Sequence, residues 1–161
     1  HEGDMFVFTS PTPARRALFV PAARAAGSNE VLAAAQAPGF DPAAVVWLDD
    51  GPVAALERRA QGSAGIVADG ANAVAVEVVC DGPGWLLLLD NWFPGWEATV
   101  GGKPAVVRRA DYSFRAVEVP GGHSLVSFRY RPASFRLGCL LAALAALALA
   151  AGLSRRYSSM T

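Results

Sequence analysis

Apolar and polar residues alternate along several short stretches of the chain between Ala73 and Tyr130. Valines occupy every second position from Ala73 to Cys80, and Trp96 to Val100 alternates in a similar way. Because side chains two residues apart share one face of a strand, both stretches predict strands with one buried face. Trp85 to Leu89 is apolar throughout, which predicts a central strand covered on both faces. Strands that recur about every eight to twelve residues are typical of a β-sandwich or barrel.

Glycine and proline mark the turns between these strands. The pair Gly101-Gly102 predicts a two-residue hairpin turn, since glycine takes positive φ without strain, and Pro104 to Arg109 is the expected returning strand. Phe114 to Val119 and Leu125 to Tyr130 predict a second hairpin around a Pro-Gly-Gly-His turn. These stretches together predict an antiparallel β core over residues 71–133.

The first seventy residues are less regular. Two short strands are predicted, at Arg16 to Val20 and at Val45 to Leu48. An alanine-rich helix is predicted over Asn29 to Gln36, and a loop or weak helix over Gly51 to Gly65. Ser28 is the expected N-cap of the helix, and Pro38-Gly39 is expected to end it. We expect this part to pack on the sheet rather than to form a second domain.

The sequence from Leu137 to Leu153 holds seventeen uncharged residues, rich in leucine, alanine and glycine. As a helix this run would be about 26 Å long, close to the hydrocarbon core of about 30 Å that a membrane presents. Arg155 and Arg156 follow at once, as in a segment that stops on the cytoplasmic side. Arg129, Arg131 and Arg136 lie before the run, so the charges alone leave the orientation open. A buried core helix is the alternative, because alanine inserts weakly into membranes. We expect a transmembrane helix over 134–154.

Small residues recur on one face of this predicted helix, at Ala142, Ala146 and Ala150. Such a stripe lets membrane helices pack closely, so it predicts helical neighbours from outside this chain. An alanine-rich genome that fills a generic span would give the same pattern. The sequence leaves both interpretations open.

Composition supports a membrane segment and excludes some partners. Hydrophobic residues make up 53% of the 161 residues, above the usual share for a soluble domain. The 14 basic residues balance the 14 acidic ones, so no net field argues for nucleic acid. Cys80 lies in a predicted strand and Cys139 in the apolar run, so we expect no disulfide and no metal site. No signal-peptide pattern precedes Met5, so an exported domain predicts a longer parent protein.

The ionisable side chains give little indication of catalysis. The candidate groups are two adjacent acids that suit a turn, three further acids and one histidine: Asp49, Asp50, Asp90, Glu97, Asp111 and His123. Two glycosidase carboxyls must lie about 5 to 9 Å apart, and nothing in the sequence places any pair so. His123 has no Cys or His partner at metal-ligand spacing, and no phosphate-binding loop or Ser/His/Asp signature occurs. We therefore expect no catalytic residue, metal or cofactor in this chain.

Aromatic and basic residues are the stronger candidates for binding. Four aromatic residues surround a Pro-Gly turn: Trp92, Phe93, Trp96 and Tyr112. They would suit either a stacking platform for sugar rings or a lipid interface. Alternatively, Trp96 belongs to the core and the Pro-Gly pair only fixes a bend. Three arginines are candidate contacts for lipid phosphates, although a strand's solvated face explains them equally well: Arg108, Arg109 and Arg115.

The most distinctive part of the sequence is the string from Asp90 to Ala98, Asp-Asn-Trp-Phe-Pro-Gly-Trp-Glu-Ala. Three further motifs follow it, at Gly102 to Pro104, Arg109 to Arg115 and Phe128 to Pro132. In this order they resemble the C-terminal region of the YfhO family of bacterial multispanning membrane proteins. That pattern has an aromatic Pro-Gly-Trp turn, a glycine-containing hairpin, an Asn/Asp-Tyr-x-Phe-Arg strand and a Tyr-x-Pro exit into the last membrane helix. The resemblance covers about Pro13 to Leu153 and departs from the pattern at Gly101, where the family usually has Asp.

The resemblance implies a large integral membrane protein similar to the GT-C glycosyltransferases, which use polyprenyl-phosphate sugars on the outer face. Members of the family have been linked to glycosylation of cell-envelope polymers such as teichoic acids. The catalytic carboxylates of such enzymes lie in loops between the early membrane helices, so this fragment would be noncatalytic. Its implied partners are membrane lipid, other transmembrane helices of the parent, and a polyprenyl-phosphate sugar or envelope glycan.

The sequence thus predicts a mainly β fold, an antiparallel β-sandwich-like extracytoplasmic domain followed by one C-terminal transmembrane helix. The domain covers 1–133, with a less regular αβ segment at 1–70. The helix is expected to lie in the bacterial cell membrane, and a cytoplasmic tail at 155–161 follows it. One alternative is a single-pass, membrane-anchored carbohydrate- or partner-binding module, and another is a purely structural cap. Exposed aromatic rings would favour binding, and buried rings would favour the cap.

Overall fold

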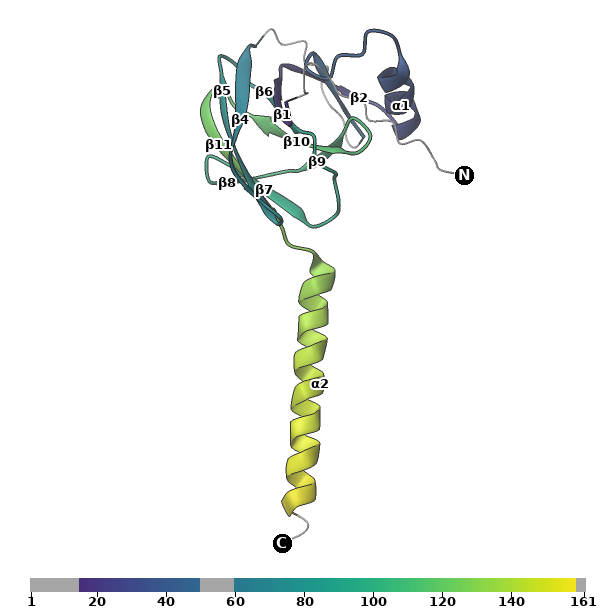
Figure 1. Ribbon diagram of the computed structural model, residues 1–161, viewed down its shortest axis with the longest axis vertical. Helices are drawn as coiled ribbons and strands as arrows, with labels where there is room; N and C mark the ends of the chain where they lie inside the picture. The colour runs from purple at the N-terminus through teal and green to yellow at the C-terminus, as the bar shows by residue number, and fades with distance from the viewer. Residues whose placement is uncertain (1–14, 50–59, 159–161) are drawn as a thin grey trace, which may run out of the picture.

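The computed structural model describes residues 15–49 and 60–158, which form a two-sheet β domain and a long C-terminal helix (Figure 1). One sheet has six strands in the order β1-β6-β10-β9-β3-β2, and the other has five in the order β4-β5-β11-β7-β8. The pairings are antiparallel except for β2 with β3. The six-stranded sheet consists of β1 (Ala17–Val20), β6 (Gly84–Leu88), β10 (Phe114–Val119), β9 (Arg108–Ala110), β3 (Val45–Leu48) and β2 (Ala22–Ala25). The five-stranded sheet consists of β4 (Gly62–Gly70), β5 (Ala73–Cys80), β11 (Gly122–Tyr130), β7 (Trp96–Val100) and β8 (Lys103–Ala105).

The main hydrophobic core lies between the two sheets. Val74, Val76 and Val78 of β5 face Leu86 and Leu88 of β6 within this core. The alternate residues of β6, Trp85 and Leu87, belong to a second cluster on the other face of the six-stranded sheet. Every residue of β6 is therefore buried, as its uninterrupted apolar sequence predicts. The mainly β, sandwich-like architecture expected from the sequence is confirmed.

The second predicted hairpin is wrong, because the chain changes sheet at its turn. β10 pairs with β6 and β9, whereas β11 pairs with β5 and β7 in the other sheet. The crossing passes close to another loop, since a Cβ on Gly121 would lie 3.1 Å from the Cα of Gly82. Gly122 then takes a φ of 102°, which favours glycine. The proline and glycines thus form a connection between the two sheets rather than a hairpin turn.

The first predicted hairpin is confirmed only in its first half. Gly101 and Gly102 have φ of 55° and 79°, and β8 returns alongside β7. The expected returning strand from Pro104 to Arg109 then divides, because β9 joins the six-stranded sheet and pairs with β10. Both sheets are therefore linked through the exposed segment around Val106.

In the first part of the chain the strands near Arg16 to Val20 and at Val45 to Leu48 are confirmed as β1 and β3. The strands β2 and β4 were not expected. β4 carries three glycines and exposed side chains, so it lacks an apolar signal, yet it pairs along most of β5 at the sheet edge. Of the loop or weak helix expected over Gly51 to Gly65, residues 51–59 lie outside the described residues, and 62–65 belong to β4.

Helix α1 (Ser28–Gln36) forms where the alanine-rich stretch predicts it, but its cap differs. The N-cap residue is Gly27, whose carbonyl accepts hydrogen bonds from the backbone N–H groups of Glu30 and Val31. Ser28 is instead the first helical residue, and its hydroxyl lies 3.2 Å from a carboxylate oxygen of Asp49. Ser28 thus contributes to a polar contact with the residue that follows β3 rather than to the cap.

Helix α2 (Ala133–Ser158) extends away from the sandwich as a single straight element (Figure 1). Its leucines from Leu137 to Leu147 are 54–67% exposed. Within the part of the chain that the structure describes, no helix combines the length and apolar character needed to cross a membrane. Residue 136 and residues 148–154 of the expected span have side chains outside that description.

Candidate functional site

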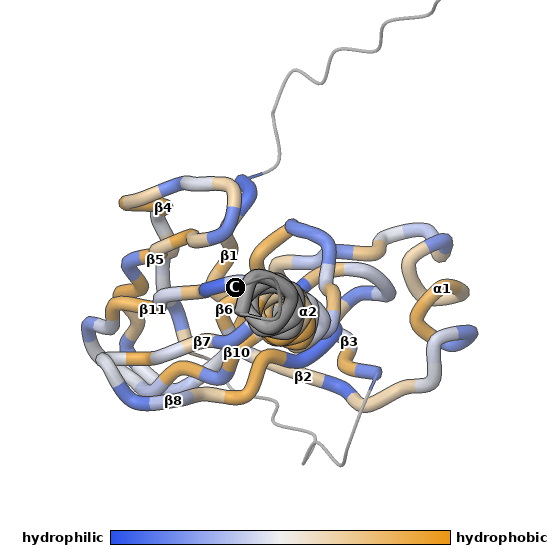
Figure 2. The backbone as a smooth tube through the Cα atoms, turned by 90° about the horizontal axis from the view of Figure 1, so that it is seen from below, coloured by the Kyte–Doolittle hydropathy of each residue, from blue (hydrophilic) through white to orange (hydrophobic). Residues whose placement is uncertain are grey.

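Strand register gathers several loops and strand ends at the end of the sandwich from which α2 leaves. Tyr130 of β11, two residues before Pro132 and the helix, pairs with Trp96, so the 89–95 loop lies at this end. Arg129 pairs with Ala73, which places the β4–β5 turn there as well. Leu88 pairs with both Ala17 and Arg115, which adds the start of β1 and the 111–113 turn. We call this end the helix-proximal end; Figure 2 views it along α2, with the sheets extending around the helix axis.

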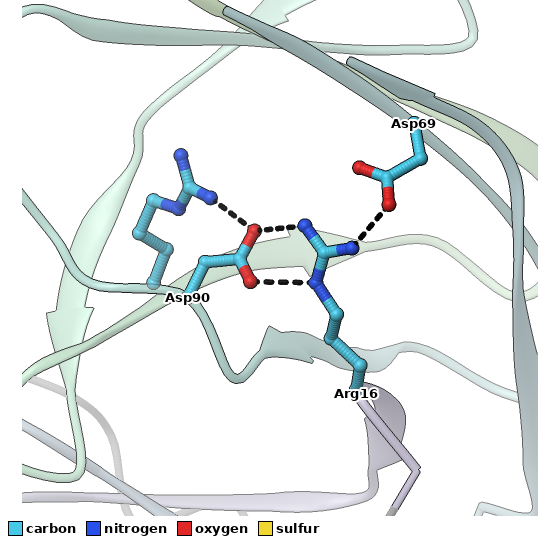
Figure 3. Close-up of polar contacts among 4 residues, drawn as sticks. Arg16, Asp69 and Asp90 are labelled. Atoms are coloured by element: carbon cyan, nitrogen blue, oxygen red, sulfur yellow. Dashed lines mark hydrogen bonds and ion pairs between the residues drawn. The ribbon is translucent and has the colours of Figure 1, made fainter. Parts of the chain in front are cut away.

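An ion-pair network occupies the helix-proximal end (Figure 3). Asp90, just after β6, accepts two hydrogen bonds from Arg16, at 2.6 Å from Nε and 2.9 Å from Nη2. It also accepts one from Nη2 of Arg115 at 2.6 Å. Arg16 in turn donates to Asp69 of β4 at 2.5 Å. The network therefore ties the six-stranded sheet to the edge of the five-stranded sheet.

Arg115 is the buried member of this network, at 1% exposure. It alternates along β10 with Val117 and Val119, so it points between the sheets with them. Its guanidinium carbon lies 3.6 Å from the ring centroid of Trp96, within the range for a cation–π contact. Among the described residues, Nε and Nη1 of Arg115 have no hydrogen-bond partner. The carboxylate of Asp90 is the counter-ion of the Arg115 guanidinium.

The environment holds Asp90 as a carboxylate. Hydrogen bonding from Arg16 is the main cause that lowers the pKa of Asp90, and Arg115 adds to it, while burial opposes the shift. Burial lowers the pKa of Arg115, but arginine starts so far above neutral pH that the guanidinium stays charged. A carboxylate with a lowered pKa is a poor general acid at neutral pH. The chemistry of the network is that of a structural cross-link.

A shallow cleft of about 390 Å³ opens over the network, with Asp69, Asp90, Trp96 and Arg115 among its lining residues. Two arginines and two aspartates balance each other there. Because each charge already has a partner of opposite sign, the cleft has little electrostatic attraction for an added ion. This arrangement favours a role in joining the sheets rather than in binding a charged ligand.

The four aromatic candidates fall into two groups. The backbone N–H of Trp92 donates to the carbonyl of Ser113 at 2.7 Å, so the loops that carry Trp92, Phe93 and Tyr112 meet at the helix-proximal end. Phe93 is 55% exposed, Tyr112 is 48% exposed, and Trp92 is half-buried. Trp96 instead stacks over Arg115 and contacts Tyr130, with ring centroids 5.2 Å apart. The structure thus brings the loops that carry three of the four candidates together at this end of the sandwich.

The three arginine candidates have different surroundings. Arg109 forms an ion pair with the buried carboxylate of Asp49 and donates to the hydroxyl of Ser28 at 2.9 Å. Arg108 places its guanidinium carbon 5.9 Å from the ring centroid of Trp85. Arg115 is buried, so it does not face a surface where a lipid phosphate could reach it. Its alternation with valines along β10 is the sequence signal that could have revealed this.

Asp111 is a second buried carboxylate at the same end. It has a φ of 45°, and the adjacent Tyr112 has a φ of 74°, in the left-handed region that only a minority of residues adopt. Its Oδ1 accepts from the backbone N–H of Trp47 at 2.8 Å, and its own N–H donates to the carbonyl of Trp47 at 2.7 Å. Burial raises the pKa of Asp111 to about 6. This residue fixes β3 to the 111–113 turn.

His123 lies in β11 rather than at a hairpin tip, and its exposed ring is 2.6 Å from the carboxylate of Glu77. Across residues 15–49 and 60–158, no three potential ligands gather as a metal ion requires. Comparisons with models of protein families, with curated proteins and with solved structures find no match. The relationship to the YfhO family therefore remains a prediction based on the motifs themselves.

Proposed function

We propose that this chain is the C-terminal extracytoplasmic domain and last membrane helix of a YfhO-like membrane protein, and that the sandwich itself is noncatalytic. The observation that carries the proposal is α2, which stands apart from the sandwich with its leucines exposed. An apolar helix that does not pack on its own domain needs lipid or other helices around it.

The residues of α2 divide into two apolar faces. At about 100° per residue, the leucines between 137 and 147 lie on one side, and Ala142, Ala146 and Ala150 lie on the opposite side. A leucine face suits lipid tails, and a small-residue face suits close packing against a neighbouring helix. The proposed partners of α2 are therefore membrane lipid and further transmembrane helices of the parent.

Length and flanking charges agree with a membrane span. The 26 residues of α2 extend over about 39 Å, and the uncharged run within them covers about 26 Å, close to a hydrocarbon core of about 30 Å. The sequence has Arg136 before the uncharged run and Arg155 and Arg156 after it, so both ends can reach headgroup phosphates. In the orientation that the family resemblance implies, the sandwich lies outside the cell and residues 155–161 lie in the cytoplasm.

The parent would be a glycosyltransferase that uses a lipid-linked sugar, in line with the family resemblance. Its catalytic carboxylates would belong to loops outside this chain, and the sandwich would support the outer-face site. Reading the genomic frame upstream of His1 tests this part of the proposal. Many membrane spans with acidic residues in the first outer loop would support it, and a single signal peptide would contradict it.

The anchor itself predicts a fractionation result. Expressed behind a cleavable export signal in a bacterial host, the chain should stay in the membrane pellet after extraction with alkaline carbonate. Replacing Leu141 and Leu144 together with arginine should release it, because each arginine near the helix centre costs about 2.5–3.5 kcal/mol of insertion free energy.

A matched control adds the same two charges to exposed apolar positions of the sandwich, by Val106→Arg and Leu125→Arg. That control should remain in the pellet. Release of the unaltered chain by carbonate, or retention of the Leu141→Arg/Leu144→Arg variant, would contradict the anchor.

A further inference from the structure

We infer that the Trp92–Gly95 loop and Tyr112 rest in the headgroup region of the bilayer and thereby fix the tilt of the sandwich on the membrane. This inference rests on the proposed membrane anchor α2. It assigns a lipid surface to a part of the domain that the anchor alone would leave in water.

The connection between the sandwich and α2 is short and braced by this loop. Only Arg131 and Pro132 separate the last residue of β11 from the first of α2. The backbone N–H of Arg131 donates to the carbonyl of Gly95 at 2.7 Å. Gly95 has a φ of 106°, and a Cβ there would lie 2.8 Å from the Cα of Pro132. The loop is therefore packed directly against the residues at which the chain would enter the membrane.

The exposed residues of this region have the chemistry of a membrane interface. Phe93 and Tyr112 are about half exposed, and Phe135, in the first turn of α2, is 70% exposed. Tryptophan and tyrosine rings favour the boundary between headgroups and lipid tails because one end of each is apolar and the other polar. Leaving these rings in water would keep an apolar patch exposed beside the helix.

Basic residues accompany the aromatic rings. Arg15, Arg129 and Arg131 are exposed, and the strand register places them at the helix-proximal end. Arg131 has a weak, exposed contact of 3.4 Å with Glu97, which leaves its guanidinium free to turn toward a phosphate. Arginines near an anionic lipid surface are attracted to its phosphates. Aromatic rings and cations together match a lipid headgroup layer.

A glycan fits the same residues less well. Sugar binding on aromatic rings requires a groove that also supplies polar contacts. Trp92, Phe93 and Tyr112 line none of the three clefts described on the sandwich, although Arg129 and Arg131 line one of them. The rings instead project at the helix-proximal end, where a flat surface rather than a ligand would cover them.

The test uses the full chain in vesicles of phosphatidylethanolamine and phosphatidylglycerol, with a fluorescent label on a cysteine at position 93. The background is Cys139→Ser, because Cys139 is exposed whereas Cys80 is buried and its pKa is raised by burial. Phe93→Cys carries the label in one protein, and Tyr112→Cys carries it in a second. The matched control is Val106→Cys, on the exposed crossover between the sheets.

Labels at 93 and 112 should emit at shorter wavelength than the label at 106, and a lipid with a shallow nitroxide should quench them several-fold more. Carbonate extraction of the same vesicles reports on the anchor separately. Retained protein with equal quenching at all three positions would overturn the inference and leave the anchor standing. Emission at 93 that changes with added envelope glycan but not with the lipid quencher would overturn it in favour of a glycan-binding loop.

Discussion

Replacing Asp90 with asparagine is expected to lower the free energy of unfolding by about 3 kcal/mol, because it leaves Arg115 as a buried charge without its counter-ion. Arg115 is 1% exposed, and Asp90 is its hydrogen-bonded partner at 2.6 Å. The same substitution weakens the contact with Arg16 and so loosens the link between the sheets. Urea unfolding of the full chain in detergent micelles, followed by tryptophan fluorescence, measures the loss.

The matched control is Asp69→Asn at the outer end of the same network. Asp69 and Arg16 are both substantially exposed, so this variant should lose less than about 1 kcal/mol. Equal losses for the two variants would mean that burial of Arg115 does not set the energetics of the network. The pKa of Asp90 is lower in the folded state than its value of about 3.9 in the unfolded state. The carboxylate therefore stabilises the fold fully above about pH 3.9, and this stabilisation is lost as pH falls through the lower, folded-state pKa.

Asp111 should have the opposite effect on the pH dependence of stability. Burial raises its pKa to about 6, so between the unfolded value near 3.9 and that pH the folded state binds more protons than the unfolded state. Stability then falls as pH rises through this window, by up to about 3 kcal/mol from this group alone. Above pH 6 the full cost of burying the charge is present.

The variant Asp111→Asn isolates this contribution. Asparagine tolerates positive φ and can still accept the hydrogen bond from Trp47, but it does not ionise. The difference in unfolding free energy between the two proteins should change by about 2.4 kcal/mol from pH 4 to pH 7.5 in favour of the variant. If the difference in unfolding free energy did not change with pH over this range, burial would not raise the pKa of Asp111, and this account of the residue would be wrong.

The strands with strong patterns could be predicted from the sequence, and the sheet that each one joins could not. β5 has alternating valines and β6 is continuously apolar, and both form as expected. The turn before β11 has hairpin residues, but it carries the chain from one sheet to the other. A turn signal reports local backbone geometry, whereas the choice of sheet depends on which partners bury the strand's inner face.

The candidate site shows the same limit. The aromatic string around Pro94 was recognisable because its residues are adjacent, and its loop meets the turn that carries Tyr112 at the helix-proximal end. Arg16 and Asp69 were missed, because Arg16 reaches its main partner across 74 positions of sequence and no local pattern records such a contact. Arg115 was recognised as a candidate, but for a surface role that its burial excludes.

The central claim, a sandwich held outside the cell by α2, is tested most directly by thiol labelling of intact cells. The chain would be expressed behind a cleavable export signal in the Cys139→Ser background, with one new cysteine in the sandwich, Val106→Cys, or in the tail, Ser159→Cys. A membrane-impermeant maleimide should label the cysteine at 106 in intact cells, and the one at 159 only after the membrane is permeabilised. Labelling at both positions in intact cells would show that α2 does not span the membrane and would contradict the account.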